Sequence, residues 1–330
     1  MGLGLRRANH KPFSLFPSLP SVTSFVITGF PLDYCLVSVH SVPARLFMFP
    51  YNQYELIDFG DGRKLERFGP VLLDRPAPAA QDLPRRIQSR WKQADFVFGG
   101  GTQSKSQWKP KTAASQPGTI TDGRITWDLK LAEFGHVGVF PEQASNWDWI
   151  VQQVRRARRP LRVLNLFAYT GGSTLAAAWA GAEVVHVDSA KNTVAWARRN
   201  AKLSGLADRP IRWIVEDATK FVRREVRRQN FYDAVILDPP SYGHGPKNET
   251  WKISRDLLPL LSQCAQLTKP VRAFVLLTCH STGLGAAELE ATLADSFFGS
   301  CGAGARAKPL CLRTSAGRQL HAGVVARYPG

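Results

Sequence analysis

Two acidic side chains each follow an apolar segment that is typical of a β-strand. Asp188 ends one such segment, and Asp238 ends another, directly before Pro239 and Pro240. A third feature is the turn after Phe167, which carries Gly171-Gly172. Because glycine has no Cβ, this backbone can approach a ligand closely. A strand, a glycine-rich turn, a helix and a second strand that ends in a carboxylate form a unit that cradles nucleotides, with the carboxylate on the ribose hydroxyls.

Open α/β sheets bind ligands outside the carboxyl ends of their strands. We therefore expect further residues at these strand ends to contact the ligand. Combined with the later Asp-Pro-Pro segment, the glycine turn indicates S-adenosylmethionine, and therefore a methyltransferase. Asp188 would accept hydrogen bonds from the ribose and Asp217 would reach the adenine amino group, unless each only caps the helix that follows it. The turn would pass under the methionine part of the ligand with Phe167, Ala168, Tyr169, Thr170, Gly171 and Gly172.

Two other nucleotide ligands are disfavoured at this turn. A dinucleotide site would carry the full G-x-G-x-x-G pattern, which is absent here. A phosphate-binding P-loop would carry a lysine, which Gly171-Gly172-Ser173-Thr174 lacks. Hydride transfer is therefore the weaker interpretation.

Asp238 is the first candidate for contact with the substrate. Pro239 and Pro240 supply no amide hydrogen and restrict φ, so they hold the loop extended. The loop would aim its carbonyl groups and Asp238 at a planar base, unless it is an ordinary turn at a strand end. Ser241 takes the fourth position, which is usually aromatic in methyltransferases that act on amino groups, so an exocyclic amine is disfavoured as the acceptor.

Cys279 is the second candidate, at the end of a neighbouring strand. We expect it to lie beside Asp238 and to face the same cleft. A thiolate that adds to carbon 6 of a pyrimidine makes carbon 5 nucleophilic, which is covalent catalysis by an activated thiol. His280 or a nearby arginine would lower the pKa of such a thiol. The alternative is a buried cysteine that serves as a small apolar side chain.

The net charge of +17 and the pI near 10.0 favour a polyanionic partner such as RNA. Two arginine groups would contact phosphates or simply face solvent: Arg155, Arg156, Arg158, Arg159 and Arg162, and Arg223, Arg224, Arg227 and Arg228. The five cysteines lack C-x-x-C spacing, so reduced thiols in an intracellular protein are expected and a metal site is not. No apolar run approaches the ~18 residues of a membrane span.

We divide the chain into three parts. Residues 1–50 are rich in Ser and Pro and poor in acids, which predicts a disordered, targeting or mis-called segment. Residues 51–140 predict a small β-rich accessory domain, with a hairpin in which residues 51–59 and 64–73 flank the turn Gly60–Arg63. Residues 141–330 predict the methyltransferase domain. The location is expected to be cytoplasmic, or an organelle if residues 1–50 are a transit peptide.

Strand and helix patterns alternate in the last part, which predicts an α/β fold with a mostly parallel, Rossmann-like sheet covered on both faces. The sheet would be closed by an antiparallel hairpin of residues 309–313 and 323–328. The expected strands are 162–167, 183–188, 211–215, 232–237 and 271–278. The expected helices are 173–179, 191–203, 219–229 and 253–267, with one further helix at 147–156 before the sheet.

Several of these segments resemble class I S-adenosylmethionine-dependent methyltransferases, and most of all the family of the bacterial 23S rRNA (cytosine-C5) methyltransferase I. The resemblance lies in Asn165–Gly172, Asp188-Ser189, Asp238–Ser241, the Cys279 segment and Phe134–Gln143. It implies that Phe140 and Gln143 line the cofactor site together with Asp188 and Ser189, and that Asp238 contacts a flipped base. The family's RNA-binding PUA module has no counterpart in residues 1–50.

The expected activity is therefore methylation of a base in ribosomal RNA, with cytosine C5 favoured, S-adenosylmethionine as the cofactor, and Asp238 and Cys279 as the catalytic residues. Two alternatives remain at this stage. One is a methyltransferase for another base position, such as guanine N7, or for an acceptor other than RNA. The other is an RNA-binding protein that retains the cofactor without turnover.

Overall fold

The computed structural model describes residues 1, 49–99, 107–113, 116–245, 249–281, 283–300 and 304–330. The described residues from 49 to 330 belong to one compact unit. The expectation for residues 1–50 lies almost wholly outside the described residues. The division at residue 140 stays a prediction.

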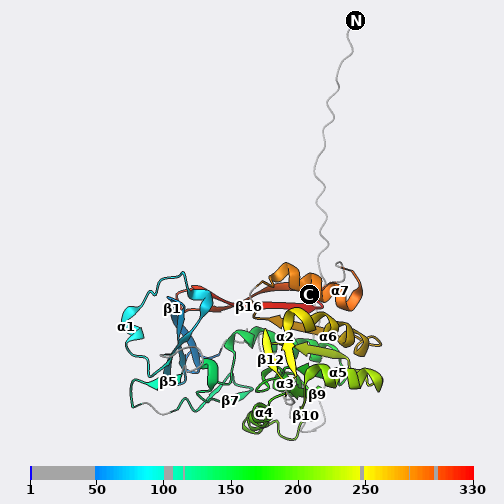
Figure 1. The fold of residues 1–330 in the computed structure, drawn as a ribbon, viewed down its shortest axis with the longest axis horizontal. Coiled ribbons are helices and arrows are strands. Elements are labelled where there is room, and N and C mark those ends of the chain that lie inside the picture. The colour runs from blue at the N-terminus through cyan, green and yellow to red at the C-terminus, as the bar shows by residue number, and fades with distance from the viewer. Residues whose placement is uncertain (2–48, 100–106, 114–115, 246–248, 282, 301–303) are drawn as a thin grey trace, which may run out of the picture. The chain divides into compact units, whose positions relative to one another are not determined.

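Short strands form an N-terminal sheet, in which tight turns join β1 to β2 and β2 to β3 (Figure 1). The expected hairpin is present, but the segment 64–73 is two strands rather than one. The reason is local: Gly69 has a φ of +55° and precedes Pro70, which favours a turn. The sheet has the order β1 (Tyr54–Gly60), β2 (Arg63–Phe68), β3 (Val71–Pro76), β4 (Phe96–Gly99) and β5 (Gln107–Pro110).

Short elements connect this sheet to the rest of the chain. The strand β7 ends at Asp128, because Lys130 and Ala132 after it form backbone hydrogen bonds in a loop. These connecting elements are η1 (Pro78–Ala80), α1 (Gln88–Trp91), β6 (Thr119–Thr121), β7 (Thr126–Asp128), η3 (Glu133–Gly135) and η4 (Pro141–Gln143).

The large sheet confirms the predicted Rossmann-like α/β fold. Its order is β10-β9-β8-β11-β14-β16-β15; the strands from β10 to β14 are parallel, and β16 and β15 are antiparallel to their neighbours. The strands are β8 (Arg162–Leu166), β9 (Glu183–Asp188), β10 (Ile211–Val215), β11 (Ala234–Leu237), β14 (Phe274–Cys279), β15 (Arg306–Arg313) and β16 (Gln319–Tyr328).

Helices cover both faces of this sheet, so apolar side chains alternate between two cores. Phe274 and Leu276 of β14 join the core of α2 and α3, whereas Val275 and Leu277 join the core of α5, α6 and α7. The helices are α2 (Ala144–Arg156), α3 (Gly172–Trp179), α4 (Lys191–Leu203), α5 (Ala218–Arg227), α6 (Ile253–Leu267) and α7 (Ala286–Phe298), and a small hairpin of β12 (Tyr242–His244) and β13 (Thr250–Lys252) precedes α6. Within the described residues, none of these helices has the length and apolar composition needed to cross a bilayer.

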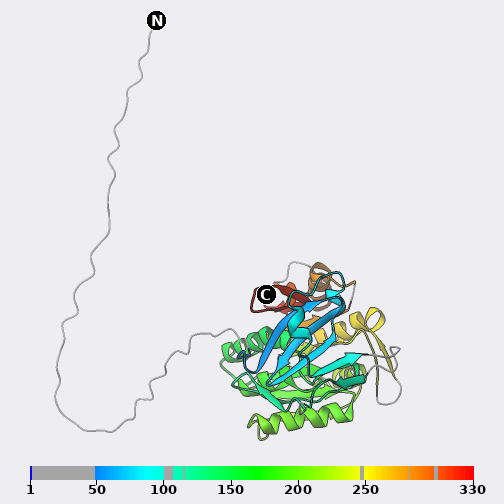
Figure 2. The same ribbon diagram turned by 90° about the vertical axis from the view of Figure 1, so that its left-hand side faces the viewer.

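The closing hairpin of β15 and β16 is longer than expected and also reaches the N-terminal sheet (Figure 1, Figure 2). Thr314 forms an isolated bridge with Leu56 of β1. Leu312 and Leu320 pack in one apolar cluster with Leu56 and Phe59. The two sheets are therefore joined by packing as well as by the chain.

Candidate active site

Two cavities meet at Phe167, at the carboxyl ends of the parallel strands. The first has a volume of about 40 Å³ and the second about 50 Å³, and Phe167 lines both. Of the predicted cofactor residues, Phe140, Gln143, Phe167, Ala168, Tyr169, Thr170, Gly172 and Asp238 line the first cavity. Phe167, Asp188, Ser189 and Asp217 line the second. The structure thus brings together residues that are about 100 positions apart in the chain.

The turn after β8 holds an unusual backbone. Phe167 and Tyr169 have φ values of +55° and +48°, and Gly171, the N-cap of α3, has a φ of +93°. Non-glycine residues rarely adopt positive φ, and such conformations gather at functional sites. A Cβ on Gly172 would lie 2.7 Å from the Trp147 ring, so that position requires glycine.

A buried polar network supports this turn from below. Asn165 Nδ2 donates to Thr174 Oγ1 at 2.9 Å, and Thr174 Oγ1 lies 2.9 Å from His186 Nδ1. Burial lowers the pKa of His186 to about 3, so the ring is neutral. The network therefore fixes the turn without placing a charge beneath it.

Asp188 lies at the end of β9 and is suited to bind hydroxyl groups. Its Oδ2 accepts a hydrogen bond from Tyr169 N at 2.9 Å, and its Oδ1 accepts one from Ala190 N at 2.9 Å. Burial raises its pKa above the usual value, and these two bonds oppose that shift. A carboxylate has about four acceptor positions, so two remain for a ligand. The residues present therefore fit a ribose.

Asp217 also caps a helix. Its Oδ1 accepts a hydrogen bond from Lys220 N at 2.9 Å at the first turn of α5. Asp217 thus does cap the helix that follows it. Its contact with adenine stays a prediction. Trp251 lines the same cavity, 4.8 Å from Phe167 between ring centroids.

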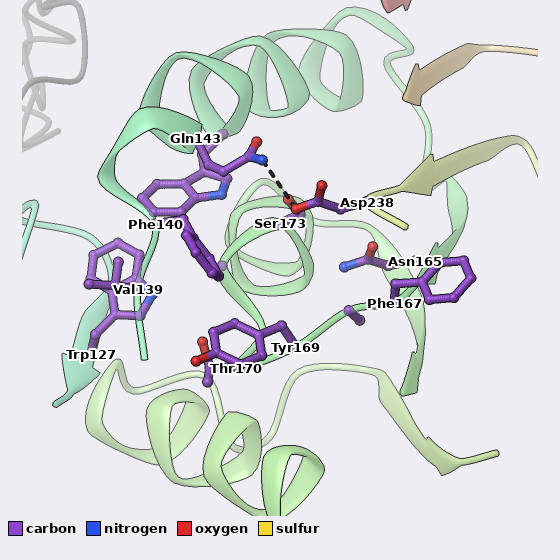
Figure 3. Close-up of a pocket in the computed structure, with 13 residues that line it drawn as sticks. Trp127, Val139, Phe140, Gln143, Asn165, Phe167, Tyr169, Thr170, Ser173 and Asp238 are labelled. Atoms are coloured by element: carbon purple, nitrogen blue, oxygen red, sulfur yellow. Dashed lines mark hydrogen bonds between the residues drawn. The ribbon is translucent and has the colours of Figure 1, made fainter. Parts of the chain in front are cut away.

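An aromatic wall closes the first cavity. The ring centroids of Phe140 and Tyr169 lie 5.3 Å apart (Figure 3). The ring centroids of His136 and Phe140 also lie 5.3 Å apart. Burial lowers the pKa of His136 to about 4, so this ring is neutral at pH 7. Phe140 and Tyr169 thus give an aromatic surface to the cavity that Asp238 also lines.

Asp238 is held by three side chains. Gln143 Nε2 donates to its Oδ2 at 3.1 Å (Figure 3), Thr278 Oγ1 donates to its Oδ1, and His280 Nε2 lies 3.3 Å from Oδ1. Burial would raise the pKa of Asp238, but His280 and Thr278 hold it below its usual value. This carboxylate is therefore ionised and fixed in orientation.

His280 is the counter-charge of Asp238. Its Nδ1 donates to the carbonyl of Ala322 at 2.7 Å, which leaves Nε2 for the carboxylate. Burial would lower the pKa of His280, but Asp238, and more weakly Glu142, raise it to about 9. The sequence predicted His280 only as a neighbour of the thiol. The signal for its role was the alternation of side chains along β14, in which Thr278 and His280 share a face.

Cys279 lies on the other face of β14. It is 1% exposed and belongs to the apolar cluster that includes Leu261 of α6 and Leu289 of α7. Leu277 is paired with Leu237, so Thr278 is the residue level with Asp238. The expectation that Cys279 faces the same cleft as Asp238 is therefore corrected: the two-residue repeat of the strand turns it into the core.

The predicted arginine groups are partly occupied by acids. Arg224 Nη1 lies 2.5 Å from Glu216 Oε1, and Arg159 Nη2 lies 2.6 Å from Asp233 Oδ1. Arg156, Arg223 and Arg227 are exposed. The last two remain candidates for phosphate contacts on α5.

Residues 104–286 match a family described as S-adenosylmethionine-dependent methyltransferase. A crystal structure of an S-adenosylmethionine-dependent methyltransferase from Agrobacterium tumefaciens is 36% identical, with a TM-score of 0.78 over 84% of this chain and 91% of that one. A structure from Streptococcus mutans shares the fold at 17% identity, with a TM-score of 0.64 over 84% of this chain and 74% of that one.

Curated relatives are similar over part of their length. The ribosomal RNA large subunit methyltransferase K/L of Shewanella sp. (strain W3-18-1) is 34% identical over 246 residues, which are 74% of this chain and 31% of that protein. The protein of the same name from Methylococcus capsulatus is 36% identical over 123 residues, 37% of this chain and 16% of that protein. The chain spans less than a third of the length of such relatives.

Proposed function

Because the chain belongs to the family of S-adenosylmethionine-dependent methyltransferases, and is thus an enzyme with S-adenosylmethionine as its cofactor, we propose that it methylates a base of ribosomal RNA. The proposal is supported by the named activity of the partial relatives and by the net charge of +17. The observation that carries it is the ionised Asp238 at the mouth of an aromatic-walled cavity. Cytoplasmic location stays a prediction.

The residues present fit the cofactor. One cavity would hold its adenosine part and the other its methionine part. Asp188 would bind the ribose hydroxyls, and Asp217 and Trp251 would lie at the adenine. The turn from Phe167 to Gly172, with Phe140 and Gln143, would hold the methionine part. When bound, S-adenosylmethionine supplies an electrophilic methyl group.

Asp238 would then orient the acceptor. A carboxylate only accepts hydrogen bonds, so it would bind an N–H edge of a base that has left its stack. The His280 imidazolium and the Thr278 hydroxyl keep this carboxylate charged and in place. The protein's contribution is therefore positioning within the cavity that Phe140 and Tyr169 line.

The position on the base is the finer part of the proposal. Methylation at cytosine C5 requires a nucleophile at carbon 6, and Cys279 would have to leave its apolar cluster to supply it. A ring nitrogen such as guanine N7 is already nucleophilic and requires no thiol. The buried position of Cys279 favours the ring nitrogen. We propose both positions as candidates, which the next experiment distinguishes.

The decisive measurement uses labelled S-adenosylmethionine and total RNA from a strain that lacks the protein. Label in a ribosomal RNA nucleoside is the expected result, and its identity distinguishes 5-methylcytidine from 7-methylguanosine. Cys279→Ala should retain transfer if the acceptor is a ring nitrogen and lose it if the route is covalent. Label absent from RNA, with cofactor binding intact, would overturn the RNA substrate.

A matched pair of variants separates binding from transfer. Asp238→Asn keeps the size of the side chain and removes its charge, so we expect transfer to fall by about 100-fold or more. Cofactor affinity, measured by calorimetry, should change little. Asp188→Asn should instead weaken cofactor affinity. Equal loss of cofactor affinity in both variants would contradict the separate roles.

A further inference from the structure

A third cavity, larger than the two at the active site, lies between α2 and the hairpin of β15 and β16. Its volume is about 270 Å³. It is lined by Trp149, Gln152, Gln153, Arg156, Arg306, Ala307, Lys308, Arg327 and Gly330. Four of these described residues are cationic and none is acidic. No role has been given to this cavity so far.

The sequence places these side chains on two facing surfaces. Residues 149, 152, 153 and 156 are spaced i, i+3, i+4 and i+7, so they lie on one face of α2. Arg306 is paired directly with Arg327 across β15 and β16. Lys308 is two residues further along β15 and therefore faces the same side. The cations converge because both periodicities direct them into the same space.

Charge repulsion makes this arrangement costly unless an anion is present. Like charges directly opposite in a sheet are destabilising. Burial lowers the pKa of Arg327 to about 10, and burial together with Arg327 lowers that of Lys308. The only acid within 4 Å of Arg306 among the described residues is Glu290, at 3.7 Å. Asp148 also acts on Arg327, so the side chains of Glu290 and Asp148 stand against four cations and the cluster keeps an excess of positive charge.

Several donors of the cluster have no protein acceptor. The Nε of Arg327 is buried and has no hydrogen-bond partner among the described residues. Lys308 and Arg156 are exposed, and their side chains form no hydrogen bond or ion pair with any described residue. Trp149, beside the Arg327 guanidinium at 5.2 Å, adds an aromatic surface. A group with several oxygen acceptors and negative charge would match these donors.

The cavity is connected to the active site by hydrogen bonds. Arg327 Nη2 donates to Asn146 Oδ1 and, at 3.0 Å, to the carbonyl of Ser145. Asn146 Nδ2 donates to Gln143 Oε1 at 2.5 Å, and Gln143 Nε2 donates to Asp238 Oδ2 at 3.1 Å. Ser145 and Asn146, in the first turn of α2, therefore link Arg327 of the cluster to Gln143, which contacts Asp238.

We propose that this cavity binds a phosphodiester of the substrate RNA and so positions the strand while another nucleotide occupies the site at Asp238. The proposal rests on the proposed function for the identity of the polyanion. Helix α2 has 13 residues and is about 20 Å long at 1.5 Å per residue. The cavity along it therefore contacts nucleotides other than the one that is methylated.

The test removes the two cations that have no protein partner. The double variant Arg156→Ala/Lys308→Ala should leave the fold and cofactor affinity unchanged. Each phosphate contact contributes about 0.7–0.9 to the slope of log K against log salt. We expect that slope for unmethylated RNA, measured by fluorescence anisotropy, to fall by about 1, with a matching rise in KM for RNA and no change in KM for the cofactor.

The control removes the same charge elsewhere. Arg198 and Arg209 are exposed and lie outside the cavity, so Arg198→Ala/Arg209→Ala should leave the slope closer to that of the wild type. Equal slopes in the two double variants would overturn the cavity proposal even if RNA is methylated. Wild-type protein that binds RNA without methylating it would overturn the proposed function, while the slopes still test the cavity. Failure of the wild type to bind RNA would overturn both.

Discussion

The charge on Asp238 depends on His280, which faces it across 3.3 Å. The pKa of His280 is raised to about 9 from 6.5. A raised pKa means that the imidazolium stabilises the folded state fully below pH 6.5 and that this contribution is lost as the pH rises through about 9. The lowered pKa of Asp238 acts in the opposite direction, and its contribution is lost only in acid.

We therefore predict that His280→Gln lowers the melting temperature more at pH 6 than at pH 10. Thermal unfolding of both proteins across this range measures the difference. The control is His321→Gln, since His321 is exposed and forms no ion pair among the described residues. A difference between wild type and His280→Gln that stays constant with pH would contradict the pairing of the imidazolium with Asp238.

At the scale of elements, we predict that the turn between β8 and α3 contributes to cofactor affinity. Gly171 has a φ of +93°, and its added Cβ would lie 3.2 Å from that of Ala197. Gly181 has a φ of +105° with nothing near its Cβ, and it follows α3 instead of lying in the turn before that helix. Both positions impose a backbone penalty on alanine, of order 1–3 kcal/mol.

We predict that Gly171→Ala weakens cofactor binding by about tenfold, which is about 1.4 kcal/mol, whereas Gly181→Ala destabilises the protein without weakening binding. Calorimetric titration with the cofactor, together with chemical unfolding, checks both variants. Equal effects on affinity would show that general destabilisation, not the turn, lowers the binding.

The elements that the sequence predicted well have strong periodic signals. β9, β10, α4 and α6 have the predicted bounds, because apolar residues recur at the strand or helix period between clear polar turns. Residues 64–73 were predicted less well, since Gly69 interrupts a continuous strand-like composition. The end of β14 was harder still. Which of Thr278, Cys279 and His280 faces Asp238 depends on the register with β11, and a single sequence does not contain that register.

At the scale of the whole described unit, the tip of the β15–β16 hairpin joins the two sheets through one buried carboxylate. Asp58 is 1% exposed and accepts hydrogen bonds from Arg86 N, Ile87 N and Trp91 Nε1. Arg318 of the hairpin turn lies 2.5 Å from its Oδ1. Burial would raise the pKa of Asp58, but the hydrogen bonds from Trp91 Nε1, Ile87 N and Arg86 N hold it below its usual value.

We predict that Arg318→Ala lowers the free energy of unfolding by about 2–3 kcal/mol, because it leaves a buried carboxylate without its counter-charge. The same variant also removes the bond from Arg318 Nη2 to the carbonyl of Phe59. Arg313→Ala, on the same hairpin but exposed, should change the stability by about 0.5 kcal/mol or less. Urea unfolding at pH 7 measures both.

The pH dependence identifies Asp58 as the cause of that loss. A lowered pKa means that the stabilisation by Asp58 is present above pH 3.8 and is lost as the pH falls through the folded-state value. The difference between wild type and Arg318→Ala should therefore shrink in acid, where protonated Asp58 no longer needs a cation. If the difference is the same at pH 3 and pH 7, the loss comes from the bonds of Arg318 to the carbonyl groups of Phe59 and Pro84 and not from its pairing with Asp58.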